Sequence, residues 1–209
     1  IYVDNEELIV PGDIYNMCRY KFDWIDISPQ NKYYASIDGI IYTADKKTLV
    51  RCPVGRTGRV VIPDGVTAIG HDAFRFCNIS EAVIPDSVTE AGYAAFADSH
   101  IEKFTLGKGI TYISKRMFRL CRNLKHIHIP SNIKEIMSSA FSSCKAVEDI
   151  VLDEGVERIG PDAFEANTTN DIKISLPSSV KMIEGGALRN IKNITLTNKI
   201  PSGFFTSLY

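Results

Sequence analysis

A short hydrophobic pattern recurs along most of the chain. Each copy begins with an apolar–any–apolar triplet, continues with two apolar residues three positions apart, and ends near a phenylalanine. The triplets begin at Val60, Ala82, Phe104, Ile127, Ile150, Ile174 and Ile194, so successive starts lie 22, 22, 23, 23, 24 and 20 residues apart. Periods of about 20 to 50 residues are typical of solenoids, in which each copy forms one coil that stacks on its neighbours. The pattern predicts a single repeat domain over residues 1–209.

The triplet of each copy predicts a short β-strand. Because strand side chains alternate between two faces, the outer residues of the triplet enter the core and the middle residue faces solvent. The second apolar pair, such as Val66 and Ile69, predicts the opposing wall of the coil, and the segment around the phenylalanine predicts a helical turn. Proline lacks an N–H and ends strand pairing after several triplets. These prolines are Pro63, Pro85, Pro130 and Pro177. The expected fold class is an α/β repeat solenoid with short parallel strands.

The domain is expected to have three parts. Residues 1–28 predict an N-terminal cap with degenerate repeats, and residues 58–209 predict the regular repeats of 22–24 residues. Residues 29–57 break the register between them. Within this interval, the segments 39–43 and 48–51 predict a β-hairpin inserted into one coil.

The repeat resembles a known family. Residues 62–77, with the sequence IPDGVTAIGHDAFRFC, are similar to the consensus of the BspA-type leucine-rich repeats, and residues 37–42 and 47–53 resemble an insert common among them. The sequence departs from this pattern where proline is replaced, at Gly107, Asp153 and Thr197.

The resemblance implies a fold and a function. The fold is a right-handed superhelix with a concave parallel sheet. The family consists of bacterial, or sometimes protist, surface proteins that bind host or matrix proteins and other cells, so an extracellular or cell-surface location is expected from the resemblance alone. The family has no catalytic residues to assign to this chain.

The overall charge argues against two classes of partner. The 24 lysines and arginines nearly balance the 25 aspartates and glutamates, which gives a formal net charge of −1. Such a chain has no strong field to attract nucleic acid or an anionic membrane. No apolar run reaches the roughly 18 residues needed to span a bilayer, and the N-terminus lacks the pattern of a signal peptide. We expect neither nucleic-acid binding nor direct membrane insertion.

The cysteines follow the repeat rather than a metal-binding motif. Cys77, Cys121 and Cys144 each lie three residues after a repeat phenylalanine, a position that predicts buried free thiols. No Cys-x-x-Cys motif occurs, which argues against a zinc–thiolate site. Cys121 and Cys144 lie on neighbouring coils and form the one pair expected to be close enough to oxidise. Cys52, in the insert, is expected to be the least constrained and open to solvent.

His126 and His128 form the sharpest metal-like group, because residues two apart on a strand point the same way and Asp149 is expected on the next strand. Zinc accepts such ligands, but an ordinary solvated surface is the favoured interpretation. The common motifs of hydrolases and nucleotide-binding enzymes are absent, and the adjacent carboxylates Asp153 and Glu154 occupy a turn. We expect no metal, no cofactor and no catalytic activity, so a carbohydrate-active hydrolase is the least favoured function.

The outward residues of successive strands predict a partner-binding face, since a solenoid holds them at fixed spacing on a rigid support. The face mixes charged, polar and apolar groups, which suits a protein or a glycan better than a polyanion. An alternative is that the chain is only a spacer or stalk in a larger surface protein, and another is that this face is merely solvated while binding lies elsewhere. The candidate binding residues are Arg59, Glu81, Lys103, Thr105, His126, His128, Asp149, Val151 and Lys173.

Overall fold

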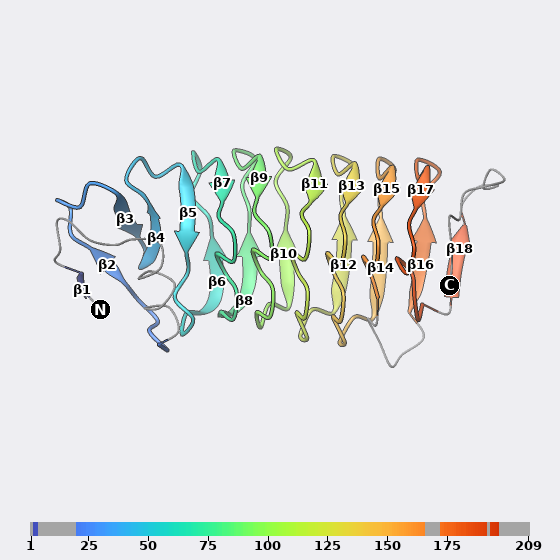
Figure 1. The fold of residues 1–209 in the computed structure, drawn as a ribbon, viewed down its shortest axis with the longest axis horizontal. Helices are drawn as coiled ribbons and strands as arrows, with labels where there is room; N and C mark the ends of the chain where they lie inside the picture. The colour runs from blue at the N-terminus through green and yellow to red at the C-terminus, as the bar shows by residue number, and fades with distance from the viewer. Residues whose placement is uncertain (1, 4–19, 166–171, 192, 197–209) are drawn as a thin grey trace.

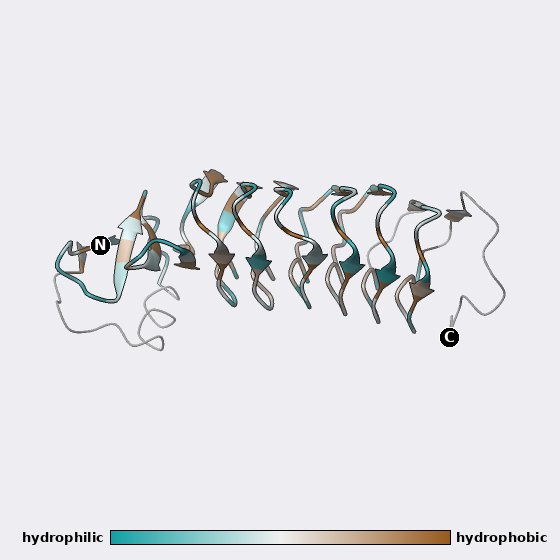
Figure 2. Cartoon of the chain, turned by 90° about the horizontal axis from the view of Figure 1, so that it is seen from above, coloured by the Kyte–Doolittle hydropathy of each residue, from teal (hydrophilic) through white to brown (hydrophobic). Residues whose placement is uncertain are grey.

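The chain folds into an elongated rod of stacked coils (Figure 1). The computed structural model describes residues 2–3, 20–165, 172–191 and 193–196. Each regular coil has three walls, which we call the strand wall, the second wall and the phenylalanine wall. Viewed from above, successive coils lie side by side along the rod (Figure 2). In the described part of the chain there is no helix, and therefore none able to cross a lipid bilayer.

The strand wall consists of the predicted triplets. Its strands pair in parallel in two ladders, β6-β8-β10 and β12-β14-β16-β18. The predicted alternation is confirmed in β12, where Ile127 and Ile129 are buried and His128 is exposed. It is weaker in β10, where Phe104 is only partly buried, and it fails at Ile194 of β18, which is exposed. The strands are β6 (Thr57–Val61), β8 (Asn78–Val83), β10 (Lys103–Thr105), β12 (His126–Ile129), β14 (Asp149–Leu152), β16 (Lys173–Leu176) and β18 (Asn193–Leu196).

The second wall is also a β-structure, built from two-residue strands at the second apolar pair of each repeat. It contains the ladders β7-β9 and β11-β13-β15-β17, all parallel. The inward residue of each strand, such as Ile69 or Ile136, is buried. The strands are β7 (Ala68–Ile69), β9 (Glu90–Ala91), β11 (Tyr112–Ile113), β13 (Glu135–Ile136), β15 (Arg158–Ile159) and β17 (Met182–Ile183).

The phenylalanine wall is not helical, so the predicted helical turns are wrong. Its N–H groups alternate between two kinds of acceptor. The N–H of Phe74 donates to the carbonyl oxygen of Ala95 in the next coil at 2.6 Å, whereas the N–H of Arg75 donates to Asp72 in its own coil at 3.0 Å. The residues two before and two after the phenylalanine have positive φ, as at Asp72 (53°) and Phe76 (64°). A helix would keep every hydrogen bond inside one coil.

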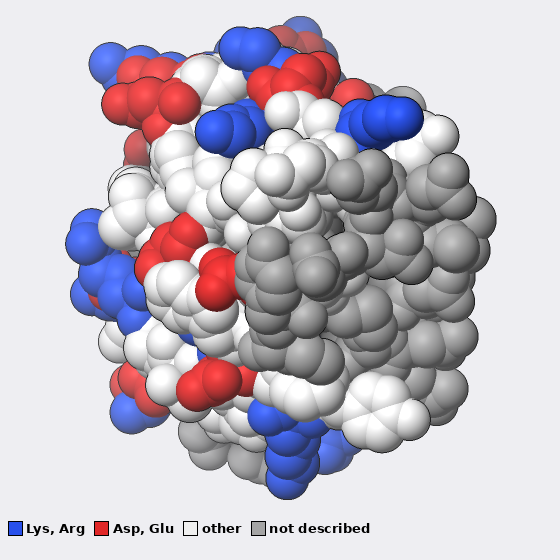
Figure 3. Space-filling view, turned by 90° about the vertical axis from the view of Figure 1, so that its left-hand side faces the viewer, with Lys and Arg blue, Asp and Glu red and all other residues white. Residues whose placement is uncertain are grey.

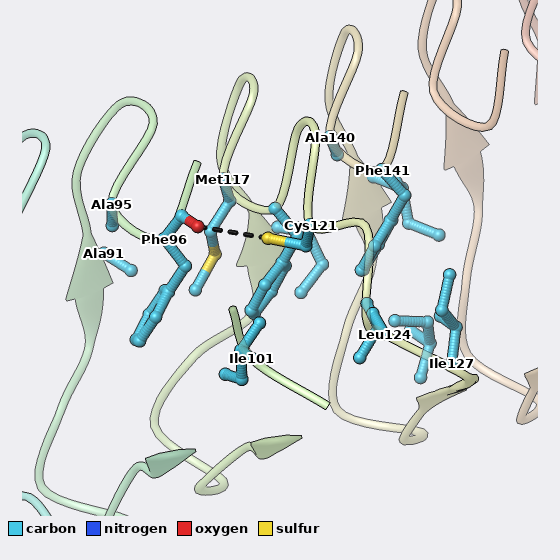
Figure 4. Packing of buried hydrophobic residues seen from close by; sticks show 14 of the residues in the cluster. Ala91, Ala95, Phe96, Ile101, Met117, Cys121, Leu124, Ile127, Ala140 and Phe141 are labelled. Atoms are coloured by element: carbon cyan, nitrogen blue, oxygen red, sulfur yellow. Dashed lines mark hydrogen bonds between the residues drawn. The ribbon is translucent and has the colours of Figure 1, made fainter. Parts of the chain in front are cut away.

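One hydrophobic core runs along the rod from Ile40 to Leu188. The repeat phenylalanines stack through it with nearly parallel rings, at centroid distances of 4.6 to 5.5 Å between successive coils. The cysteines fill the space beside this stack as free thiols. The thiol of Cys121 donates to the carbonyl oxygen of Phe96 in the preceding coil at 3.1 Å (Figure 4). The column of buried phenylalanines and thiols agrees with the sequence prediction.

The insert extends the second wall at the N-terminal end of the rod. Strands β3 (Tyr34–Ile37), β4 (Ile40–Thr43) and β5 (Thr48–Arg51) pair in antiparallel order, and β5 then pairs in parallel with β7. The predicted hairpin is therefore present as β4 and β5, with β3 as an additional strand. Beyond it, β1 (Tyr2–Val3) pairs with β2 (Asp26–Ile27).

The end of β5 covers the first coil of the phenylalanine wall. The N–H of Cys52 donates to the carbonyl oxygen of Ala73 at 2.8 Å, and the buried guanidinium of Arg51 donates to the carbonyl oxygens of Arg75, at 3.2 Å, and Asp72. Cys52 is completely buried as a result. The expectation that it is exposed is wrong because the insert docks on the rod instead of projecting from it.

The ladders of the strand wall and the second wall are both interrupted beside the coil that contains β10 and β11. Strand β10 pairs with β8 and not with β12, and β11 pairs with β13 and not with β9. The phenylalanine wall continues past both gaps. In the same coil, glycine replaces proline at Gly107, where an added Cβ would lie 2.2 Å from the carbonyl oxygen of Pro85. Glycine replaces proline at this position because the turn lies too close to the preceding coil to accommodate a side chain.

Candidate partner-binding face

The strand wall presents two rows of positions that alternate with the core positions of each strand, and these rows together form the strand face. In one row, strand pairing aligns Arg59 with Glu81 and Lys103 across β6, β8 and β10. In the C-terminal part, the same row aligns His126 with Asp149 and Lys173. The predicted order of these residues along the sheet is present in the structure. The second row contains Val61, Val83, Thr105, His128, Val151 and Ser175.

In the N-terminal part of the strand face, one carboxylate lies between two cations. The Glu81 carboxylate is 3.3 Å from Nε of Arg59 and 3.2 Å from Nζ of Lys103. Desolvation raises the pKa of Glu81, but hydrogen bonds and the positive charges of Lys103 and Arg59 outweigh it, so the pKa is below its usual value. The carboxylate is therefore ionised at neutral pH, and its ion pairs hold the side chains of Arg59 and Lys103 toward the central strand β8.

In the C-terminal part, two imidazoles each contact a carboxylate of the next coil. Nδ1 of His126 lies 2.8 Å from Oδ2 of Asp149, and Nε2 of His128 lies 3.0 Å from Oδ1 of Asp153. Asp153 was not among the predicted binding residues. Its signal in the sequence is its place directly after a triplet, where the repeat has proline, since a side chain there continues the exposed row of the strand.

The nine predicted residues thus fall into two groups separated by the gap between β10 and β12. Arg59, Glu81, Lys103 and Thr105 lie before the gap. His126, His128, Asp149, Val151 and Lys173 lie after it. Between the charged groups, valine side chains reach solvent, with Val61 53% exposed and Val151 48% exposed.

The histidines and carboxylates of the strand face form separate pairs. Each histidine contacts a different aspartate, and among the described residues no three His, Cys, Asp or Glu side chains form a group able to hold a metal ion. Glycoside hydrolysis needs one carboxyl group with a raised pKa. The pKa of Glu154 is instead lowered, because it accepts hydrogen bonds from the N–H groups of Ser178 and Ser179 and from the Ser178 hydroxyl. The Glu154 side chain therefore anchors the neighbouring turn as a carboxylate.

The two signs of charge are also mixed at the end of the rod. Figure 3 shows the N-terminal end, where basic and acidic side chains are interspersed on the described surface. Such mixing offers no continuous basic stripe to a polyanion on this side of the molecule.

Solved structures with the same fold come from several bacterial proteins. A leucine-rich cell surface protein of Faecalibacterium prausnitzii is 27% identical, with a TM-score of 0.63 over 84% of this chain and 42% of its own. The leucine-rich repeat protein of T. pallidum is 25% identical, with a TM-score of 0.60 over 78% of this chain and 79% of its own. The pneumococcal vaccine antigen PcpA is 15% identical, with a TM-score of 0.66 over 85% of this chain and 51% of its own.

The chain spans about half the length of the F. prausnitzii protein and of PcpA. A search of curated protein sequences gave no match. The family model described as the BspA type leucine rich repeat region matches residues 56–171 in six copies, which is more than half of the chain. Together with the three-walled coil, its stacked phenylalanines and its parallel strand wall, this match shows that the chain belongs to the BspA-type leucine-rich repeat family.

Proposed function

We propose that the chain is a non-catalytic recognition module of a bacterial cell-surface protein and that it binds a protein partner through the strand face. The cell-surface part of the proposal is supported by the description of the F. prausnitzii protein, to which this chain is similar. The binding part is supported by the composition and rigidity of the strand face.

The observation that carries the proposal is the combination of exposed valines and cross-coil ion pairs on the two strand ladders of one wall. Protein interfaces join apolar contacts to polar groups with defined positions. On the strand face, Val61 and Val151 supply apolar contact area, while Glu81 and Asp149 fix the positions of neighbouring cations and imidazoles. Ion pairs between coils also reduce the conformational entropy that these side chains lose when a partner binds.

If the chain were only a spacer, a different composition of the strand face would be expected. A stalk needs only solvated side chains, and it gains nothing from valines at exposed positions of the strand wall. The observation therefore favours recognition over a purely structural role. The hydrolase alternative lacks support, because the exposed carboxylates of the strand face are paired or ionised and lie on an open surface.

The test is binding of the chain to a panel of purified extracellular matrix proteins by surface plasmon resonance. A triple variant, Lys103→Ala, His126→Ala and Asp149→Ala, removes exposed groups from both parts of the strand face. Its affinity for a captured partner is expected to fall at least about tenfold, as for loss of interface contacts worth over 1 kcal/mol. Its thermal unfolding midpoint is expected to change little, because exposed ion pairs contribute little to stability.

The matched control changes three exposed charged residues of the second wall, Lys134→Ala, Glu157→Ala and Lys181→Ala. This variant is expected to bind like the original chain. Equal affinity of the strand-face variant and the original chain would show that the partner binds elsewhere. No binding to any protein of the panel would contradict the proposed matrix partner.

A further inference from the structure

A hollow of about 300 Å³ lies where the phenylalanine wall turns toward the strand wall, away from the strand face. Three successive coils contribute to it. The lining residues are Phe76 from the first coil, Asp98, Ser99 and His100 from the second, and Leu120, Arg122 and Asn123 from the third. This volume is at the lower end of the range of small-molecule sites and fits one ligand residue.

The hollow arises from the order of large and small side chains in one column. Phe76, Asp98 and Leu120 occupy the same repeat position, two residues after the buried phenylalanine, with φ values of 64°, 57° and 62°. The same left-handed backbone places them at the same corner of consecutive coils. Because the short Asp98 stands between the larger Phe76 and Leu120, the column leaves an indentation with apolar sides.

Arg75 fixes the first side of this hollow. Its guanidinium lies over the Phe76 ring at 4.8 Å from the centroid, and its Nε is 3.5 Å from Oδ2 of Asp98. Phe76 nevertheless remains 45% exposed. The ring is thus held in place from one side while part of it stays open to solvent, and the charge of the Asp98 carboxylate is already matched by a cation.

On the other side of the hollow lies Arg122, a cation that has no ion-pair partner among the described residues. Arg122 also makes no side-chain hydrogen bond in the part of the chain that the structure describes, and it is exposed. Next to it, the Asn123 amide donates to the backbone carbonyl oxygen of His100 at 3.4 Å, which leaves its own carbonyl oxygen as an acceptor. The hollow therefore combines apolar sides, one unmatched guanidinium, and several side chains able to donate or accept hydrogen bonds.

The backbone beside the hollow is already engaged between coils. The N–H of Asp98 donates to Arg119, the N–H of His100 to Cys77, and the N–H of Leu120 to Ser142, at 2.8 to 2.9 Å. A bound extended peptide gains much of its affinity from backbone hydrogen bonds to a free strand edge, and these groups do not offer one. Recognition here has to use side chains, which suits the many hydroxyls of a sugar.

We propose that this hollow binds one carboxylate-bearing sugar residue of a glycan. The apolar face of the sugar ring packs against Phe76 and Leu120, and the carboxylate pairs with Arg122. The sugar hydroxyls exchange hydrogen bonds with Asn123 and Asp98. This site is separate from the strand face, so it does not depend on the proposed protein partner.

The experiment compares two small sugars that differ only at C6, methyl β-glucuronide and methyl β-glucoside, by saturation-transfer NMR and chemical-shift titration of the full chain. The glucuronide is expected to bind with a dissociation constant of about 1 mM, as for a ligand of this size. The neutral glucoside is expected to bind at least about fivefold more weakly, because it lacks the charge-assisted contact.

Variants locate the interaction. Arg122→Gln is expected to abolish the preference for the glucuronide, and Phe76→Ser, which introduces the residue present at Ser143 in the same column, is expected to weaken both sugars. Lys145→Gln is the matched control, since Lys145 follows Cys144 as Arg122 follows Cys121 but does not line the hollow. This control is expected to bind the glucuronide like the original chain.

Three results would overturn the proposal: absence of glucuronide binding, equal binding of both sugars, or an unchanged preference in Arg122→Gln. An acetylated tripeptide with a free C-terminal carboxylate is tested in parallel. If it binds through Arg122 and the glucuronide does not, the site takes a peptide and the sugar assignment is wrong. The triple strand-face variant should keep its glucuronide binding, so the failure of either proposal can be recognised independently of the other.

Discussion

Replacing Phe118 by leucine is expected to destabilise the rod more than the same change at either end of the phenylalanine stack. The Phe118 ring is completely buried and contacts three other rings, those of Phe96, Phe104 and Phe141, at centroid distances of 5.2, 4.4 and 5.2 Å. Phe74 and Phe164 each stack on one ring, at 4.6 and 5.5 Å. The chain offers its own evidence that leucine fits this column, since Leu188 occupies it in a later coil and is buried.

The magnitude follows from the number of ring contacts. The loss of buried volume on changing phenylalanine to leucine is similar at all three positions and costs about 1 kcal/mol. Each aromatic pair contributes roughly 0.5 to 1.5 kcal/mol beyond its buried area. Three lost pairs against one should therefore make Phe118→Leu at least about 1 kcal/mol more destabilising than Phe74→Leu or Phe164→Leu.

The assay is urea unfolding followed by far-ultraviolet circular dichroism, with the free energy of unfolding obtained by linear extrapolation. Comparable m-values in the three variants would show that the same structure unfolds in each. If all three substitutions reduce the free energy of unfolding by the same amount, within about 0.5 kcal/mol, the stack contributes nothing beyond burial and the reasoning fails.

Three further predictions concern the turns and the thiols. Gly109→Ala is expected to lower the free energy of unfolding by about 2 kcal/mol or more, because a Cβ would lie 2.4 Å from two carbonyl oxygens of the preceding coil. Urea unfolding measures this loss, and thermal unfolding checks it independently. Glu154→Gln should lower the unfolding midpoint at pH 7, and the difference from the original chain should shrink as the pH falls below the ordinary glutamate pKa of about 4.3. The reason is that a carboxyl group with a lowered pKa stabilises the fold only while ionised. In a Cys18→Ser variant, the four remaining thiols should resist a thiol reagent at pH 8 until the chain is unfolded. They are buried, and burial raises the pKa of Cys121 to about 12. Reaction of any of these thiols at the rate of a free cysteine would contradict this prediction.

The sequence predicted the strand wall because its pattern is local. A triplet such as Val60–Ile62 alternates with the strand period, and that alternation depends on no other coil. The family resemblance and the recurring phenylalanine then placed the core correctly, including the free thiols at Cys121 and Cys144.

The phenylalanine wall was predicted less well because its hydrogen bonds are not local. Ala73 and Phe74 are compatible with a helical turn, but the N–H of Phe74 has a carbonyl oxygen of the next coil within reach. Stacking therefore decides the backbone conformation, and no single repeat shows it. Cys52 was misplaced for a similar reason, since its burial depends on docking of the insert against Ala73.

The binding residues were predicted as one continuous face, whereas the structure divides them at the gap between β10 and β12. The sequence carries two marks of this division: glycine in place of proline at Gly107, and the aromatic Phe104 where other triplets begin with an aliphatic residue. Both are single departures from a repeat, and their structural effect depends on the neighbouring coils.

The division has a consequence for how the strand face is held together. Across the gap, no strand-wall hydrogen bonds join the coil of Lys103 to the coil of His126, so the relative position of the two groups depends on the other walls. The pairing of β11 with β13 and the hydrogen bond from Phe118 to Ala140 supply the backbone connections. Phe104 supplies a side-chain connection, because its ring stacks on Phe118 of its own coil and also on Phe141 of the next coil, at a centroid distance of 6.0 Å. The geometry of the proposed binding face is therefore set by the other two walls and by the core between them, and a partner that contacts both groups should lose affinity when Phe118 is replaced.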